Sequence, residues 1–242
     1  MKRFNRVLNG SLFLSCAAAI CIGCSQPKAP QNQTSVESIC VGKGLGMNSQ
    51  LAFEKFKEAN RMAYEGLHRQ AIKKLTKALQ IDKTFGCAYF NRAQSHIELE
   101  QFDLAISDYS SALSIQPRLA DAYTGRGLVY LRSGDLESSI KDSTQAISID
   151  RNNAFAWANR AAAKSLQKDH KGAINDYSEA LELLPNRAKF LVERGAEYLM
   201  IGEVLLACVD LERASKIEED PKKRLAVLET LDSLCSSFWR RD

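Results

Sequence analysis

The chain has 242 residues, of which 33 are basic and 29 acidic, for a net charge of +4. Three basic residues and no acidic residue fall within residues 1–23, so the rest of the chain carries 30 basic and 29 acidic residues. A nearly neutral balance lacks the basic excess that supports nucleic-acid binding, and we expect no nucleic-acid partner.

The first 23 residues have the features of a secretory signal peptide. Three basic residues lie within the first six positions, and an apolar stretch spans residues 12–22. That stretch is shorter than a membrane-spanning helix requires. The junction between Gly23 and Cys24 resembles the lipobox of bacterial lipoproteins, in which the cysteine is acylated and becomes the first residue of the mature protein. The resemblance implies that Cys24 carries a lipid such as palmitate.

Two features leave alternatives to lipid attachment at Cys24. Cys21 stands where the lipobox usually has an aliphatic residue, and Cys16 after Ser15 is a rival acceptor. Ordinary cleavage would instead release a soluble secreted or periplasmic protein, since signal features alone fit both outcomes. By the same resemblance, Ser25 after Cys24 favours the outer membrane. We therefore expect a lipid-anchored protein of the cell envelope that faces the periplasm.

Residues 24–51 form the predicted tether between this anchor and the rest of the chain. They are rich in Ser, Gln, Asn, Pro and Gly, a composition typical of flexible linkers. The glycines in residues 42–46 do not indicate a phosphate-binding loop, because no predicted strand precedes them and no Lys-Ser or Lys-Thr pair follows. As a random coil, the tether would span roughly 30 Å.

A period of 34 residues runs five times without insertion through residues 52–221. Positions 8, 20 and 27 of each period hold Ala, Gly or Ser, as expected where two helices approach closely. Glycines near mid-period and prolines near period ends are helix stop signals. Each period therefore predicts a helical hairpin. The five repeats are residues 52–85, 86–119, 120–153, 154–187 and 188–221.

This pattern resembles the tetratricopeptide repeat family. Over residues 52–221 the resemblance implies an all-α fold, a right-handed α-solenoid of five helical hairpins. Such repeats cannot bury their apolar faces alone, so the ends of the stack need caps. Residues 222–242 are the predicted capping helix at the C-terminal end. Its apolar residues recur at helical spacing, and they are Leu225, Leu228, Leu231, Cys235 and Phe238.

Two charged positions recur in opposite helices of each predicted hairpin. Position 7 is arginine and position 23 is aspartate in repeats two to five, and in repeat one both signs are reversed. The joint reversal predicts a salt bridge between the two helices of one repeat, rather than an anion-binding row of arginines. The predicted pairs are Glu58–Lys74, Arg92–Asp108, Arg126–Asp142, Arg160–Asp176 and Arg194–Asp210.

Four cysteines remain downstream of Cys24, an even number that suits disulfides in an oxidising compartment. Three pairings are open to them. Proximity favours Cys208 with Cys235, because the last repeat packs on the capping helix, and leaves Cys40 with Cys87. Buried free thiols are the alternative, since cysteine is commonly a small core residue. No spacing of cysteines or histidines predicts a metal site.

In the tetratricopeptide family, positions 2, 5, 6, 9, 12 and 13 of the first helices line a concave groove. The resemblance implies a peptide-binding surface here, with Phe53, Phe56, Tyr64 and Asn91 as preferred contacts. Packing between repeats is the alternative for side chains at positions 5 and 12. The full predicted set is Phe53, Phe56, Lys57, Asn60, Tyr64, Phe90, Asn91, Gln94, Leu128 and Asn159.

The chaperone-binding members of that family hold terminal carboxylates of a peptide with basic residues. Phe56, Asp121 and Gly125 occupy the three corresponding basic positions in this chain. The carboxylate clamp is therefore broken, which argues against a cytosolic co-chaperone role.

No catalytic motif is present: the sequence lacks G-x-S-x-G, a Cys–His pair at a family spacing, and any carboxylate pair beyond the predicted salt bridges. We expect a non-enzymatic scaffold without a cofactor, which brings envelope proteins together by binding a peptide or amphipathic helix. A carrier for a lipid or small hydrophobic ligand is the alternative. A third hypothesis is that the tether or the capping helix occupies the groove and regulates access to it.

Overall fold

The computed structural model describes residues 47–239, with side chains over residues 50–235. The chain divides into two units, Met1–Gly44 and Leu45–Asp242, and the described residues belong to the second. The predicted signal peptide, Cys24 and the tether through residue 46 therefore lie outside the described residues.

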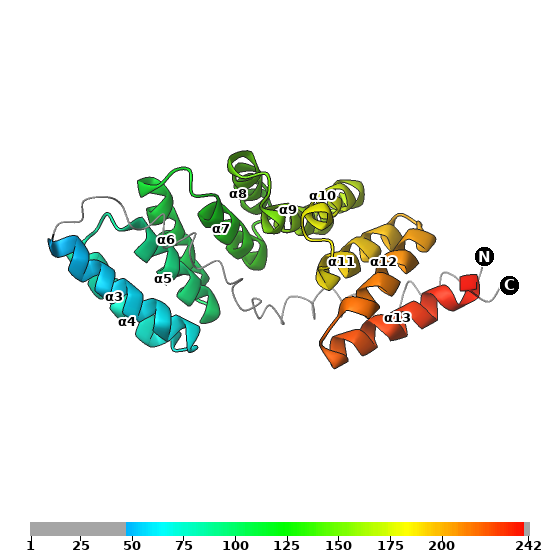
Figure 1. Cartoon of the computed structure of the whole chain (residues 1–242). Coiled ribbons are helices and arrows are strands. Elements are labelled where there is room, and N and C mark those ends of the chain that lie inside the picture. Colours follow the sequence, from blue (N-terminus) through cyan, green and yellow to red (C-terminus); the bar gives the residue numbers. More distant parts are fainter. Residues whose placement is uncertain (1–46, 240–242) are drawn as a thin grey trace. The chain divides into compact units, whose positions relative to one another are not determined.

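The described part of the chain is helical throughout (Figure 1). Its helices are α3 (Met47–Tyr64), α4 (His68–Ile81), α5 (Gly86–Glu98), α6 (Phe102–Ile115), α7 (Ala120–Ser133), α8 (Leu136–Ile149), α9 (Ala154–Leu166), α10 (His170–Leu183), α11 (Ala188–Met200), α12 (Val204–Ile217) and α13 (Pro221–Trp239). No strand occurs in residues 47–239, and the predicted all-α fold class is confirmed.

Consecutive helices form hairpins that stack in chain order. Within each repeat the first helix packs against the second, and the second helix packs against the first helix of the next repeat. Successive first helices also touch, α3 with α5, α5 with α7, and α7 with α9. The first helices therefore share one face of the stack, as in a tetratricopeptide solenoid.

Every hairpin turns through one residue in the left-handed backbone region, at position 15 of its repeat. Glycine occupies this position in three repeats, with φ of 78° at Gly66, 84° at Gly134 and 85° at Gly202. Glu100 and Lys168 adopt the same conformation, at φ of 57° and 65°, although their Cβ atoms disfavour it. The turns at the three glycines match the predicted helix breaks, and the other two repeats make the same turn at a backbone cost.

Small side chains let the two helices of a hairpin approach closely. At position 8, Ala93 and Ala161 are fully buried. A Cβ added at Gly127, the equivalent residue of the third repeat, would lie 3.1 Å from Ser143 Oγ and 3.4 Å from the Ser139 carbonyl oxygen. Even alanine would therefore crowd the second helix of that repeat.

Two apolar clusters fill the interior of the stack. One spans α5 to α7 around Phe90, Tyr109 and Val129, and the other joins α9 to α13 around Trp157 and Leu191. Burying one large apolar side chain stabilises the fold by roughly 1.5–3 kcal/mol. Because both clusters cross repeat boundaries, neighbouring hairpins stabilise one another.

Helix α13 caps the last repeat by packing against α12. Val227 and Cys235 are buried, and Leu231 and Leu234 pack on the second apolar cluster. A disulfide joins Cys235 to Cys208 of α12.

The predicted inner face of this helix needs a correction. Leu225 and Leu228 are 57% and 41% exposed, so they flank the contact with α12 instead of forming it. Val227 packs against the second apolar cluster and takes the inward place in this part of the helix. The side chain of Phe238 lies outside the described residues.

Candidate functional site

Salt bridges join the two helices of each repeat, in the pairs that the charge pattern predicts. In repeats two to five the arginine donates from Nε and Nη2 to both carboxylate oxygens of its aspartate, at 2.7–3.0 Å. All four aspartates are buried. In repeat one, Lys74 Nζ lies 2.5 Å from Glu58 Oε1, at a more exposed position.

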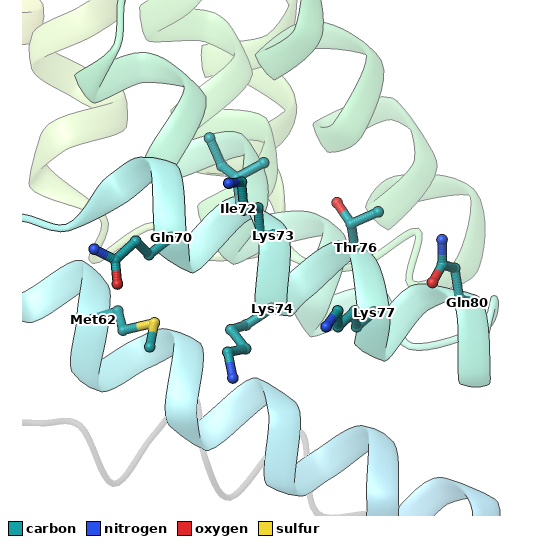
Figure 2. Close-up of a pocket in the computed structure, with 8 residues that line it drawn as sticks. All are labelled: Met62, Gln70, Ile72, Lys73, Lys74, Thr76, Lys77 and Gln80. Atoms are coloured by element: carbon teal, nitrogen blue, oxygen red, sulfur yellow. The ribbon is translucent and has the colours of Figure 1, made fainter.

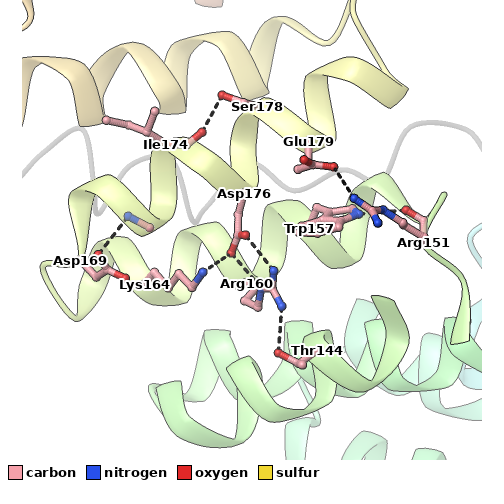
Figure 3. A network of polar contacts seen from close by, with 11 residues as sticks. Thr144, Arg151, Trp157, Arg160, Lys164, Asp169, Ile174, Asp176, Ser178 and Glu179 are labelled. Atoms are coloured by element: carbon pink, nitrogen blue, oxygen red, sulfur yellow. Dashed lines mark hydrogen bonds and ion pairs between the residues drawn. The ribbon is translucent and has the colours of Figure 1, made fainter. Parts of the chain in front are cut away.

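The same arginines also link successive repeats, through hydrogen bonds that the sequence reasoning missed. Figure 3 shows Arg160, which bonds Asp176 within its repeat and donates from Nη1 to Thr144 Oγ1 of the preceding repeat at 3.2 Å. The acceptor is each time the hydroxyl of a serine or threonine at position 25. The recurrence of a hydroxyl residue at this position is the sequence signal from which these hydrogen bonds could have been predicted. The acceptors are Thr76, Ser110, Thr144 and Ser178.

Because of these contacts, the four arginines have a structural role. The guanidinium of Arg160 also stacks on Trp157, with its Cζ 4.8 Å from the ring centroid. The hydrogen bond with Asp142 raises the pKa of Arg126, so that guanidinium stays charged. Each arginine therefore bonds residues of two neighbouring hairpins and leaves no row of open anion-binding groups.

The structure corrects two members of the predicted groove set. Phe56 is only 1% exposed and packs on Phe85, with ring centroids 5.0 Å apart. Phe90 is 7% exposed and meets Tyr109 edge-on at 5.6 Å. Both ring contacts lie within the residue's own repeat, so these rings belong to the core and cannot contact a partner.

The other predicted groove residues keep access to solvent. Lys57, Tyr64 and Gln94 are exposed, and the rest are half-buried. Some of their polar atoms already pair within the protein: Asn91 Nδ2 donates to Asn60 Oδ1 at 2.6 Å. Asn159 Nδ2 donates to the Thr124 carbonyl at 3.1 Å, between α9 and α7. The half-buried members are Phe53, Asn60, Asn91, Leu128 and Asn159.

Large apolar side chains are exposed at one recurring position of the first helices. At position 13, Tyr64 is 75%, Leu166 56% and Met200 54% exposed. Phe155, at position 2 of α9, is 41% exposed and lies under the Arg187 guanidinium. Exposed apolar residues that recur on one face mark an interaction surface better than scattered ones do. We call the face with these residues the concave face, after the family groove it corresponds to.

A buried acidic group connects α11 with the fourth repeat. Glu197 is 5% exposed and accepts hydrogen bonds from Ser165 Oγ at 2.6 Å and His170 Nδ1 at 2.8 Å. Burial raises the pKa of Glu193, one turn earlier; Lys189 opposes the shift and Glu197 adds to it. Each partner of Glu197 comes from the preceding repeat, so this cluster holds two hairpins together.

A hollow of about 440 Å³ lies at the first repeat, against the second helix rather than on the concave face (Figure 2). Lys74, one of its lining residues, is engaged with Glu58. Six of its eight lining residues are polar or basic. The lining residues are Met62, Gln70, Ile72, Lys73, Lys74, Thr76, Lys77 and Gln80.

The disulfide between Cys208 and Cys235 joins α12 to α13, with a Cα–Cα distance of 5.9 Å. Cys87 is also disulfide-bonded. Its predicted partner Cys40 lies outside the described residues, so that pairing stays a prediction. The described residues contain no group of His, Cys, Asp or Glu arranged to hold a metal ion. Among the helices in residues 47–239, none combines the length and apolar character needed to cross a bilayer.

Family models agree with the repeat architecture. A model described as TPR repeat matches residues 93–134, and one described as tetratricopeptide repeat matches residues 120–153. Tetratricopeptide repeats are therefore present in this part of the chain. A comparison with curated proteins finds no match.

Several solved structures have a similar fold. The Pseudomonas aeruginosa pilF structure has a TM-score of 0.71 at 18% identity, over 81% of this chain and 88% of that one. A MamA structure has a TM-score of 0.62 at 17% identity, over 74% and 96%. YrrB, described as a TPR protein with an unusual peptide-binding site, has a TM-score of 0.59 at 18% identity, over 74% and 92%. Such a fold is typical of protein–protein interaction scaffolds.

Proposed function

We propose that this protein is a non-enzymatic scaffold of the bacterial cell envelope, tethered by a lipid on Cys24, that binds a segment of a partner polypeptide along its concave face. The observation that carries the binding role is the exposure of Tyr64, Leu166 and Met200 at position 13 of their repeats. Apolar anchors of this kind supply most of the energy in peptide recognition. The peptide-binding site ascribed to YrrB supports the same use of the fold.

The distribution of these residues favours a polypeptide over a small ligand. They lie on α3, α9 and α11, at opposite ends of the series of first helices. A single lipid molecule needs one concave, mostly enclosed site, whereas an extended or helical segment contacts several helices in turn. No observation on the concave face favours the carrier alternative.

The disulfide between Cys208 and Cys235 supports the envelope location. Disulfides persist in oxidising compartments such as the bacterial periplasm and are rare in the cytosol. An exported protein is also what the signal peptide predicts. The outer membrane, suggested by Ser25 after Cys24, is the membrane that we propose.

Metabolic labelling with a clickable palmitate analogue tests the anchor. We expect label in the wild-type protein and in the Cys16→Ala variant, and none in the Cys24→Ala variant, with the wild-type protein recovered in the outer-membrane fraction. Unlabelled wild-type protein in the soluble periplasmic fraction would contradict the lipid anchor and leave the soluble alternative.

A paired set of surface variants tests the binding face. Leu166→Ser combined with Met200→Ser alters the concave face, whereas Leu104→Ser alters an exposed leucine on the second helix α6. We expect the double variant to lose chemical crosslinks to its envelope partner and the Leu104→Ser variant to keep them. Equal crosslinking by both would place the partner elsewhere.

A further inference from the structure

The second helix of repeat one differs in charge from the second helices of the other four repeats. Helix α4 carries Arg69, Lys73, Lys74 and Lys77 and contains no acidic residue. Each of α6, α8, α10 and α12 contains at least two acidic residues. The positive charge of α4 is therefore a local feature, which the nearly neutral balance of the repeats as a whole does not reveal.

Three of these four basic residues form a row along α4. Arg69, Lys73 and Lys77 follow one another every four residues, so they lie on one side of the helix, about 6 Å apart along its axis. All three are exposed, and none of their side chains pairs with any other residue that the structure describes. Lys74, by contrast, is engaged with Glu58. We call Arg69, Lys73 and Lys77 the basic row, and it presents uncompensated positive charge to solvent.

The hollow of about 440 Å³ at the first repeat adjoins the basic row (Figure 2). Lys73 and Lys77 line it, together with the amide side chains of Gln70 and Gln80. Ammonium and amide groups donate hydrogen bonds, and bonds from a charged donor to a phosphate or carboxylate oxygen are among the stronger ones. This side of α4 therefore suits a ligand with negatively charged oxygens.

The length and place of the basic row indicate what bears those oxygens. Its three charges are spread over about 12 Å of helix, which suits an array of negative charges better than one small anion. Acidic phospholipids present such an array, because their phosphates lie in one plane at the membrane surface. Repeat one is also the repeat next to the predicted tether, so a lipid on Cys24 would keep α4 near a membrane.

We propose that the basic row docks the first repeat onto the anionic phospholipid headgroups of the membrane that holds the protein. Each basic residue close to such a surface strengthens binding about 5-fold. Because α4 is a second helix, this contact leaves the face of the first helices open to the partner polypeptide. The inference rests on the proposed function, since the lipid on Cys24 is what brings α4 to the bilayer.

Protection of lysine side chains from acetylation tests the contact. The purified wild-type protein is reconstituted with phosphatidylcholine vesicles that contain or lack phosphatidylglycerol, treated briefly with an acetylating reagent and analysed by mass spectrometry. We expect labelling of Lys73 and Lys77 to fall at least about 5-fold with phosphatidylglycerol. It should recover in about 1 M salt, where the screening length is about 3 Å. Lys141, exposed at the same repeat position as Lys73, is the internal control and should label equally throughout. Equal labelling of Lys73 on both kinds of vesicle would overturn the proposal.

Two variants with the same loss of charge separate the basic row from general electrostatic attraction. Arg69→Gln combined with Lys77→Gln should abolish the protection of Lys73. Arg118→Gln combined with Lys171→Gln removes two exposed basic residues from other repeats and should preserve it. Protection of Lys73 by dissolved glycerol phosphate alone would indicate a site for a free anion. Protection in whole envelopes but not on phosphatidylglycerol vesicles would indicate an acidic protein, and either result would overturn the membrane contact.

The outcomes distinguish this inference from the proposed function. If the palmitate analogue labels Cys24 while Lys73 stays unprotected on phosphatidylglycerol vesicles, the docking contact is wrong and the anchor stands. If Cys24 takes no label and these vesicles still protect Lys73, the anchor fails and the basic row stands as a membrane-binding surface.

Discussion

The guanidinium of Arg126 donates two hydrogen bonds to the carboxylate of Asp142, from Nε at 2.7 Å and from Nη2 at 3.0 Å. Its third nitrogen, Nη1, donates to Ser110 Oγ of the preceding repeat at 2.8 Å. One side chain therefore closes its own hairpin and fastens it to the hairpin before. Because a solenoid has only nearest-neighbour contacts, such a bond contributes to the cooperativity of the whole stack.

Arg126→Ala is expected to lower the free energy of unfolding by about 3 to 5 kcal/mol, because it leaves the buried carboxylate of Asp142 without its partner. Lys74→Ala removes the equivalent but more exposed pair of repeat one and should cost much less. Thermal and urea denaturation followed by circular dichroism measure both. An unchanged melting temperature for Arg126→Ala would refute the framework role.

Ser110→Ala is expected to cost roughly 1.5–3 kcal/mol, the range for a hydrogen bond to a charged group, by removing the acceptor of Arg126 Nη1. Its neighbour offers a close control. Ser111 Oγ donates to the Ser107 carbonyl of its own helix and bonds no other repeat, so Ser111→Ala should change stability far less. Equal losses in urea denaturation would show that the link between repeats contributes little.

Lys168→Gly is expected to stabilise the protein by about 1 kcal/mol. Lys168 adopts φ of 65°, a conformation that a Cβ disfavours and glycine accepts. Gly134→Ala, at the equivalent turn with φ of 84°, should destabilise it for the same reason. Denaturant midpoints that move in the opposite directions would contradict this account of the turns.

Glu193→Gln is expected to raise the melting temperature at pH 7.5, with a smaller gain at pH 4. Burial raises the pKa of Glu193, so the folded state holds this proton more tightly than the unfolded state does. Stability therefore falls as pH rises from the ordinary glutamate range through the raised pKa, and the neutral glutamine avoids that loss. Glu182→Gln, at an exposed residue of α10, is the control. A gain for Glu193→Gln that is independent of pH would contradict the argument.

The repeat architecture was predictable because its signals recur at fixed positions. Ala93 and Ala161 hold the same place in two hairpins, and Arg126 and Asp142 occupy positions whose reversal in repeat one identified them as partners. A residue that recurs every 34 positions reports a contact made in every repeat. The hairpins and their salt bridges therefore follow from one sequence without any alignment.

Features that the 34-residue period does not determine were harder to predict. Position 5 carries an aromatic residue in Phe56 and Phe90, and periodicity alone cannot tell whether such a ring faces a groove or the core. The apolar pattern of α13 does not tell that Val227 is buried while Leu225 and Leu228 stay exposed. Each of these depends on tertiary contacts that the period of the sequence does not report.

We propose that a partner polypeptide binds along the concave face in the cell envelope. Photocrosslinking tests it most directly, with benzoylphenylalanine placed at Tyr64, Phe155 or Met200, and at Leu104 or Lys77 on second helices, in native envelopes. We predict that mass spectrometry identifies the same partner segment from the three concave-face positions and not from the two control positions. Crosslinks to lipid alone, or to the same protein from both sets of positions, would contradict the claim.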